Sequence, residues 1–92
     1  MSTLHVVSHS PFTDSRFASC LRVCGVNDAI LLCGDGAYGL HNPALQTQGV
    51  KVFVLAEDLQ ARSICLPDWA DSVDYAGFVQ LSLDYDKVNS WL

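Results

Sequence analysis

The chain alternates short apolar runs with segments in which apolar residues recur at helical spacing. Apolar runs bounded by Gly, Pro, Asn or Asp are typical of strands, whereas a spacing of three to four residues is typical of amphipathic helices. The pattern predicts strands at Leu4–Ser8, Ala29–Cys33, Val50–Leu55 and Ser72–Tyr75. It predicts helices at about Asp14–Cys24, Ala37–His41, Ala56–Ile64 and Tyr75–Tyr85.

The first and last predicted helices each have one apolar face. In the first these residues are Phe17, Leu21 and Cys24, and in the last they are Phe78, Leu81 and Tyr85. Ser10 or Thr13 is suited to cap the first helix, with Asp14 at the positive end of its dipole. Both helices are therefore expected to pack on a sheet through one face.

The uninterrupted apolar run Ala29–Cys33 indicates a strand that is buried on both faces, as in a parallel sheet. Alternation of strands and helices gives right-handed crossovers and a parallel arrangement. The predicted fold is therefore α/β: a single three-layer domain over residues 1–92, with a four- to five-stranded, mainly parallel sheet.

The composition is apolar for so short a chain. Of 92 residues, 50% are hydrophobic and 16% are charged, and the mean hydropathy is +0.23. A domain of this size buries only about 60–65% of the surface that its unfolded chain exposes. Part of the apolar surface is therefore expected to meet another subunit.

The net charge of −5, with five scattered basic residues, argues against direct binding of nucleic acid, which needs a basic surface. The apolar runs are about half the ~20 residues of a membrane-spanning helix. The first ten residues, MSTLHVVSHS, lack the basic segment of a signal peptide. We therefore expect a cytoplasmic protein that contacts neither membrane nor nucleic acid.

The four cysteines, Cys20, Cys24, Cys33 and Cys65, are expected to be reduced thiols in that compartment. No C-x-x-C pair occurs, and the spacings of 4, 9 and 32 residues match no common zinc site. No metal is therefore predicted.

Cys20 is the candidate reactive thiol. It lies roughly 60° from the centre of the apolar face of its helix at about 100° per residue, which predicts a position between core and surface. Arg16 precedes it by four residues, and a nearby guanidinium favours the thiolate. Cys24 is predicted to be a small buried hydrophobe, Cys33 to pack in the core or a loop near the strand ends, and Cys65 to lie in a loop.

Ligand sites of open α/β sheets form beyond the carboxyl ends of the strands. Here the polar residues after those ends include Asp35, Glu57 and Asp58, which predicts an acidic crevice. The segment G-D-G-A-Y-G at residues 34–39 matches the spacing of a dinucleotide-binding loop, but neither a long helix nor a Lys-Ser/Thr pair follows it. We interpret it as a turn and predict no cofactor.

The histidines give little support for catalysis. His9 and Ser10 follow the first strand and are interpreted as turn and capping residues, because no base–nucleophile pair is evident. His5 alternates with apolar neighbours and is predicted to be a packed core histidine. His41 lies in a loop without an evident partner.

Four blocks resemble the DsrH/TusB family of sulfur-relay subunits, in order and at matching spacing. They are L-H-V-V-S-H-S-P-F-T-D at 4–14, D-A-I-L-L-C-G-D-G-A at 28–37, V-K-V-F-V-L-A-E-D-L-Q-A-R at 50–62 and D-Y-A-G-F-V-Q-L at 74–81. Trp91 near the C-terminus is similar to a tryptophan of the family. The resemblance covers nearly the whole chain.

The resemblance implies a compact DsrE-like fold and an α2β2γ2 heterohexamer with DsrE/TusD-like and DsrF/TusC-like subunits. It further implies transfer of persulfide sulfur between protein cysteines and a downstream DsrC/TusE-like carrier. DsrH-type members of sulfur oxidisers have a cysteine in the first helix, where Cys20 falls. That position favours sulfur oxidation through the dissimilatory sulfite reductase pathway over 2-thiolation of the tRNA wobble uridine.

The resulting hypothesis is a sulfur-carrying accessory subunit, more than a stand-alone enzyme, with Cys20 as the persulfide-accepting thiol and no metal or organic cofactor. Three alternatives stay open: a TusB-type subunit of the tRNA relay, a purely structural subunit with an inert Cys20, and a small hydrolase or nucleotide-binding enzyme using the crevice near Asp35.

Overall fold

The computed structural model describes residues 2–8, 16–25, 27–41 and 50–91, with the backbone alone at 16–18 and 21. Nine elements occur in this part of the chain. In chain order they are β1 (Thr3–Val7), α1 (Arg16–Val23), β2 (Ala29–Leu32), the 3-10 helix η1 (Gly34–His41), β3 (Lys51–Leu55), α3 (Ala56–Arg62), β4 (Asp71–Val73), α4 (Tyr75–Asp84) and β5 (Lys87–Trp91).

The five strands form one sheet in the order β4-β3-β2-β1-β5, and every neighbouring pair is parallel. The central pairing aligns Leu4 with Ala29 and Val7 with Leu32. This all-parallel sheet with covering helices confirms the predicted α/β fold.

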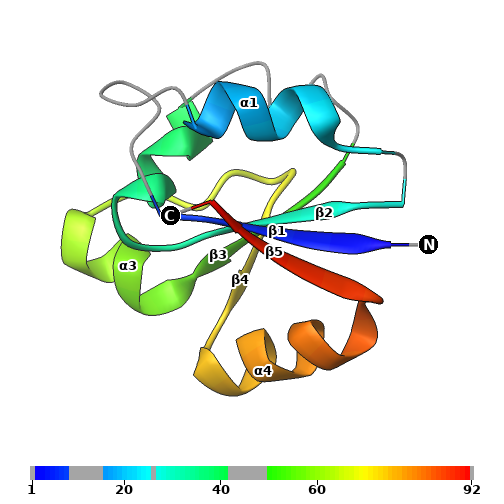
Figure 1. Cartoon of the computed structure of the whole chain (residues 1–92). Helices are drawn as coiled ribbons and strands as arrows, with labels where there is room; N and C mark the ends of the chain where they lie inside the picture. The colour runs from blue at the N-terminus through cyan, green and yellow to red at the C-terminus, as the bar shows by residue number, and fades with distance from the viewer. Residues whose placement is uncertain (1, 9–15, 26, 42–49, 92) are drawn as a thin grey trace.

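The strand order explains how the helices divide between the two faces. From β1 to β4 the chain advances across the sheet in one direction, and right-handed crossovers then place the connecting helices on one face. The connection from β4 to β5 runs back across the sheet, so α4 lies on the opposite face. Figure 1 shows α1 and α4 on opposite sides of the strands.

Alternation along the strands sends side chains into two separate apolar clusters. The α1-side core contains Val7, Cys20, Ile30, Leu32, Ala37, Leu40, Val52, Val54, Leu59 and Ala70. The α4-side core contains Leu4, Val6, Ala29, Leu31 and Leu55, with Phe78, Leu81 and Tyr85 packed against them. Packing of these last three, partly buried side chains against the cluster confirms the predicted apolar face of α4.

Local sequence sets the ends of the later helices. Asp74 caps α4, because its Oδ1 accepts a hydrogen bond of 2.7 Å from the backbone N–H of Gly77. At the end of α3, Ser63 adopts a left-handed conformation with φ of 52°, and its N–H bonds back to the last turn. These signals place both helices within two residues of their predicted ends.

Two elements differ from the sequence-based prediction. The 3-10 helix begins at Gly34, three residues before the predicted short helix. The sequence pattern predicts no strand at Lys87–Trp91, because K-V-N-S-W is largely polar. The structure forms β5 there, and four of its five residues are exposed. The predicted caps Ser10, Thr13 and Asp14 lie outside the described residues. No helix in the part of the chain that the structure describes is long and apolar enough to cross a membrane.

Candidate functional site

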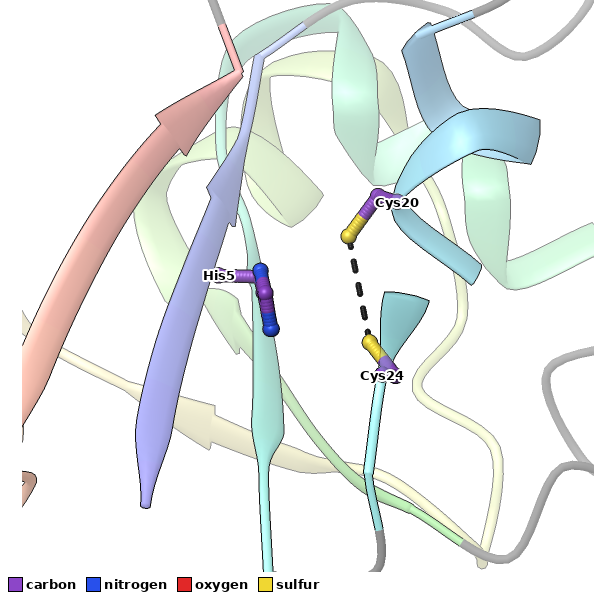
Figure 2. A group of neighbouring side chains, drawn as sticks. All are labelled: His5, Cys20 and Cys24. Atoms are coloured by element: carbon purple, nitrogen blue, oxygen red, sulfur yellow. Dashed lines mark hydrogen bonds between the residues drawn. The ribbon is translucent and has the colours of Figure 1, made fainter. Parts of the chain in front are cut away.

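The side chains of Cys20 and Cys24 meet beneath the C-terminal end of α1. A spacing of four residues places two side chains on the same side of a helix. The two Sγ atoms are 3.9 Å apart, within the distance of a sulfur hydrogen bond. Figure 2 shows both sulfurs beside the imidazole of His5, which projects from β1. The site is therefore a thiol pair next to a histidine.

The two thiols differ in burial. Cys20 is 1% exposed and belongs to the α1-side core, whereas Cys24 is partly buried at the edge of that core. The predicted boundary position of Cys20 is thus wrong. Its cluster contains residues of β1, β2 and β3, so the side chain of Cys20 belongs to the core between α1 and the sheet. The side chain of Arg16, the expected cationic neighbour, lies outside the described part.

The hydrogen bond gives the two sulfurs opposite tendencies to ionise. The pKa of Cys20 is raised far above its ordinary value of 9.0, because its S–H is held by Cys24, because it is buried, and because Cys24 and Asp28 are negative neighbours. The pKa of Cys24 is lowered, because the Cys20 thiol donates to it; burial and Asp28 oppose this shift. The pair therefore favours a thiolate at Cys24 beside a protonated Cys20.

His5 is fixed from both sides of its ring. The indole Nε1–H of Trp91 in β5 donates to Nδ1 at 3.1 Å, and Nε2 lies 3.1 Å from Oδ2 of Asp28. Because an indole N–H can only donate, Nδ1 is the acceptor and Nε2 carries the hydrogen. His5 is 4% exposed, which confirms the predicted core histidine. Neither ring nitrogen is free to act as a base toward the thiols in this arrangement.

Asp28 joins the site to the loop between α1 and β2. Its carboxylate accepts hydrogen bonds from the backbone N–H groups of Gly25 at 2.9 Å and Thr3 at 3.0 Å, besides the bond from His5. The Gly25 N–H, followed by His5 and Thr3, lowers the pKa of Asp28. This ionised carboxylate therefore fixes the position of the chain immediately after Cys24.

Among the described residues, His5, Cys20 and Cys24 form the group whose side chains could together hold a metal ion. The ligand atoms of His5, Cys20 and Cys24 lie within 4.8 Å of one another. Thiolate and imidazole are suitable ligands for Zn²⁺ or Cu⁺. Binding through His5 would require it to release either Trp91 or Asp28. As arranged, the residues form a hydrogen-bonded thiol pair.

The thiol pair lies toward the amino-terminal ends of the strands. Cys24 follows the last residue of α1, and its neighbour Asp28 immediately precedes β2 and contacts the first residue of β1. The sequence had indicated a crevice at the opposite, carboxyl-terminal edge. The general rule for α/β sheets therefore did not locate these cysteines.

Comparison with known proteins supplies the family. Residues 9–88 match the family described as DsrH like protein. The chain belongs to the DsrH-like family. Its fold is shared with the ychN protein of E. coli, with a TM-score of 0.75 over 98% of this chain and 99% of that one, at 18% sequence identity. No match was found among curated proteins.

Membership of the DsrH-like family implies a sulfur-relay subunit that works with other subunits of such a relay. This outcome confirms the resemblance seen in the four sequence blocks. Trp91 also has a physical role in this DsrH-like chain, since it fixes the ring of His5 next to the cysteines.

The carboxyl-terminal edge of this DsrH-like sheet is occupied by ion pairs. Arg62 contacts Asp35 at 3.0 Å and Asp58 at 3.2 Å, and Asp58 also accepts the N–H of Gly34 at 2.9 Å. Gly34 has a φ of +53°, and a Cβ at Gly36 would collide with the carbonyl oxygen of Val7. The positive φ of Gly34 and the close approach of Gly36 to Val7 therefore explain why glycine stands at these two positions. The N–H of Gly34, which a phosphate would need, already donates to the carboxylate of Asp58.

The remaining predicted residues lie apart from the thiol pair. Cys33 is partly buried against the α4-side core, and burial followed by the nearby Asp58 raises its pKa. Cys65 is exposed and, with His41, borders a hollow of about 510 Å³ between η1 and the segment after α3. His9 and Ser10 lie outside the described residues. Sequence reasoning missed the pairing of Cys20 with Cys24, although the spacing of four residues on one helix was the available signal.

Proposed function

We propose that this chain is a subunit of a cytoplasmic complex that relays persulfide sulfur between protein cysteines, and that Cys20 carries the sulfur. The observation behind this proposal is the 3.9 Å contact of two free thiols of unequal pKa inside a DsrH-like fold. Persulfide transfer needs a thiolate that attacks the outer sulfur of a donor persulfide. It requires no metal or organic cofactor, and the chain acts as a carrier more than as a stand-alone enzyme.

The position of Cys20 in α1 supports the sulfur-oxidation branch, with the dissimilatory sulfite reductase pathway as its destination. The alternative is a TusB-type role in wobble-uridine thiolation of tRNA. The net charge of −5 means that such a role would run through partner proteins.

An assembly with DsrE/TusD-like and DsrF/TusC-like subunits in an α2β2γ2 hexamer is supported by an exposed apolar stripe on α4. Tyr75, Val79 and Leu83 are 58%, 61% and 75% exposed and follow one another at four-residue spacing. Such a stripe is typical of a protein contact surface. A downstream DsrC/TusE-like carrier would receive the sulfur.

A structural role for the chain is the second candidate, and the burial of Cys20 favours it. A thiol with 1% exposure cannot meet a donor cysteine without movement of its surroundings. In this alternative the chain only braces the complex, and Cys20 is a core residue.

Mass spectrometry after incubation with glutathione persulfide separates the two candidates. The relay predicts one added sulfur atom on Cys20, located by fragmentation of the peptide that contains it, and Cys20→Ser should gain no sulfur in that peptide. A chain that assembles with its partners but never gains sulfur on Cys20 would support the structural role.

A further inference from the structure

We propose that Cys24 is the thiol that accepts sulfur from the donor and passes it inward to Cys20, so that the two cysteines act in sequence. This inference rests on the proposed sulfur relay and deepens it. It assigns a function to Cys24, which the sequence indicated only as a packing residue.

The first argument is access. Cys20 is 1% exposed, whereas Cys24 is partly buried and follows the last residue of α1. Its chain neighbours Val23 and Gly25 are both exposed, Val23 at 58%. A donor persulfide can therefore approach Cys24 from the end of the helix, whereas Cys20 is enclosed in the α1-side core.

The second argument is reactivity. The thiolate is the attacking form of cysteine. The two sulfurs are 3.9 Å apart, and the hydrogen bond with Cys20 lowers the pKa of Cys24 below that of an ordinary thiol, because the S–H of Cys20 can donate to a Cys24 thiolate. Asp28 opposes ionisation of both thiols, and the imidazole of His5 has both nitrogens engaged. Cys20 is thus the group that favours the Cys24 thiolate.

The transfer from donor to Cys24 is balanced without an oxidant or reductant. The Cys24 thiolate attacks the outer sulfur of the donor persulfide, one S–S bond forms and one breaks, and the donor leaves as a thiolate. The sulfane sulfur keeps its oxidation state throughout.

The second transfer uses the contact between the two cysteines. A persulfide S–S bond is about 2.05 Å long, and the two cysteine sulfurs are 3.9 Å apart. Rotation about the Cβ–Sγ bond of Cys24 can therefore turn the outer sulfur toward Cys20. Cys20 attacks that sulfur, its proton passes to the departing Cys24 sulfur, and a Cys20 persulfide and a Cys24 thiol result.

The inner position would shelter the sulfur. Cys20 belongs to the apolar α1-side core, and the ring of His5 and the sulfur of Cys24 are polar groups within 4.8 Å of its sulfur. A persulfide held there is shielded from water and from small thiols until a partner or a movement of α1 exposes it. Cys24 would thus load the carrier, and Cys20 would retain the sulfur.

The test is a time course of sulfur addition to the full chain. The chain is mixed with glutathione persulfide, quenched with iodoacetamide at intervals and digested with trypsin. Cleavage at Arg16, Arg22 and Lys51 places Cys20 in peptide 17–22 and Cys24 in peptide 23–51, where fragment ions separate it from Cys33. We expect the extra sulfur first on Cys24 and later on Cys20.

Two variants make the order testable. In Cys24→Ser, loading of Cys20 is expected to slow by about tenfold or more, because attack must wait until a buried thiol becomes accessible. The exposed Cys65→Ser is the matched control and should load Cys20 at the wild-type rate. Circular dichroism confirms folding, and Cys24→Ala replaces Cys24→Ser if the serine disturbs the helix end.

The outcomes distinguish this inference from the proposed function. Loading of Cys20 at the wild-type rate in Cys24→Ser would overturn the inference and leave the relay standing. Release of sulfide with a Cys20–Cys24 disulfide, in place of a Cys20 persulfide, would also overturn it. If the wild-type chain gains no sulfur on either cysteine, the relay itself fails.

Discussion

At the residue scale, Cys20 and Cys24 differ only in burial and in their place in one hydrogen bond. Cys20 is enclosed by the α1-side core, and Cys24 is partly buried at its edge. When Cys24 is a thiolate it can only accept, so the S–H of Cys20 is then the donor of the bond between them. Because the bond favours the charged form of Cys24, two identical functional groups acquire different chemistry. The division of roles between acceptor and carrier follows from that difference.

Removing the donor should raise the pKa of Cys24. In Cys20→Ala the thiolate loses its hydrogen bond, so the rate of alkylation by iodoacetamide should rise at a higher pH than in wild type. Cys20→Ser is the matched control, since its hydroxyl can still donate. The pH profile is followed on Cys24 in peptide 23–51, and identical profiles for the alanine variant and wild type would contradict this role of Cys20.

Because of Asp28, the free energy of unfolding should fall as the pH is lowered into the acid range. The folded pKa of Asp28 is lowered from 3.8, so its contribution is present above about pH 4 and is lost as the pH falls through the folded value. Asp28→Asn places an amide against N–H donors and should cost about 1–3 kcal/mol at pH 7.

Urea denaturation measures the free energy of unfolding of Asp28→Asn and of wild type, and the difference between the two values should become smaller below pH 4. Asp68→Asn, at an exposed turn position, serves as the control and should stay close to wild type. If this difference in the free energy of unfolding stayed constant across the pH range, stabilisation by the ionised carboxylate of Asp28 would be contradicted.

At the element scale, the junction between β2 and η1 requires glycine for reasons of space. A Cβ at Gly36 would overlap the carbonyl oxygen of Val7, which is backbone and cannot turn away. The segment that resembled a phosphate loop is therefore explained by the close approach of η1 to β1.

Gly36→Ala should destabilise the chain by about 2 kcal/mol or more, because β1 and η1 must separate. Gly25→Ala is the comparison, since a Cβ there would make only an ordinary contact of 3.7 Å with Asp28. Thermal denaturation measures both variants, and equal melting temperatures would contradict the steric argument.

The elements also show what the sequence could predict. Strong periodicity located four strands, and the unbroken run at Ala29 indicated a parallel sheet. Strand β5 lacked that signal, because as an exposed edge strand it contributes mainly backbone pairing with β1. The sequence predicts Cys20 between core and surface, whereas it is 1% exposed within the α1-side core. That burial depends on packing against other elements, which helical spacing within α1 alone does not contain.

At the scale of the whole molecule, the apolar residues are found in two kinds of place, the core and the exposed surface of α4. Two clusters fill the faces of the sheet, and a stripe of Tyr75, Val79 and Leu83 remains on the outer side of α4. The stripe faces away from the α4-side core, so it contributes little to folding of the single chain and is available to a partner.

A charge in the stripe should weaken assembly and leave folding intact. Leu83→Glu is expected to change the free energy of unfolding by less than about 0.5 kcal/mol, as for other exposed positions. It should weaken co-assembly with partner subunits by about tenfold or more. Gln60→Glu, which adds the same charge on the exposed surface of α3, is the control and should assemble like wild type. Native mass spectrometry measures the fraction of each variant bound to partner subunits. If Leu83→Glu assembled as well as the control variant, the role of the stripe would be contradicted.

The most direct test of the central claim is the sulfur content of the complex as isolated from its native host. The complex is alkylated during lysis, digested with trypsin and examined by mass spectrometry at peptide 17–22, which contains Cys20. The relay predicts that a fraction of this peptide carries one additional sulfur, which a reductant removes. A complex that transfers sulfur through cysteines of its other subunits, while peptide 17–22 never carries extra sulfur, would contradict the account.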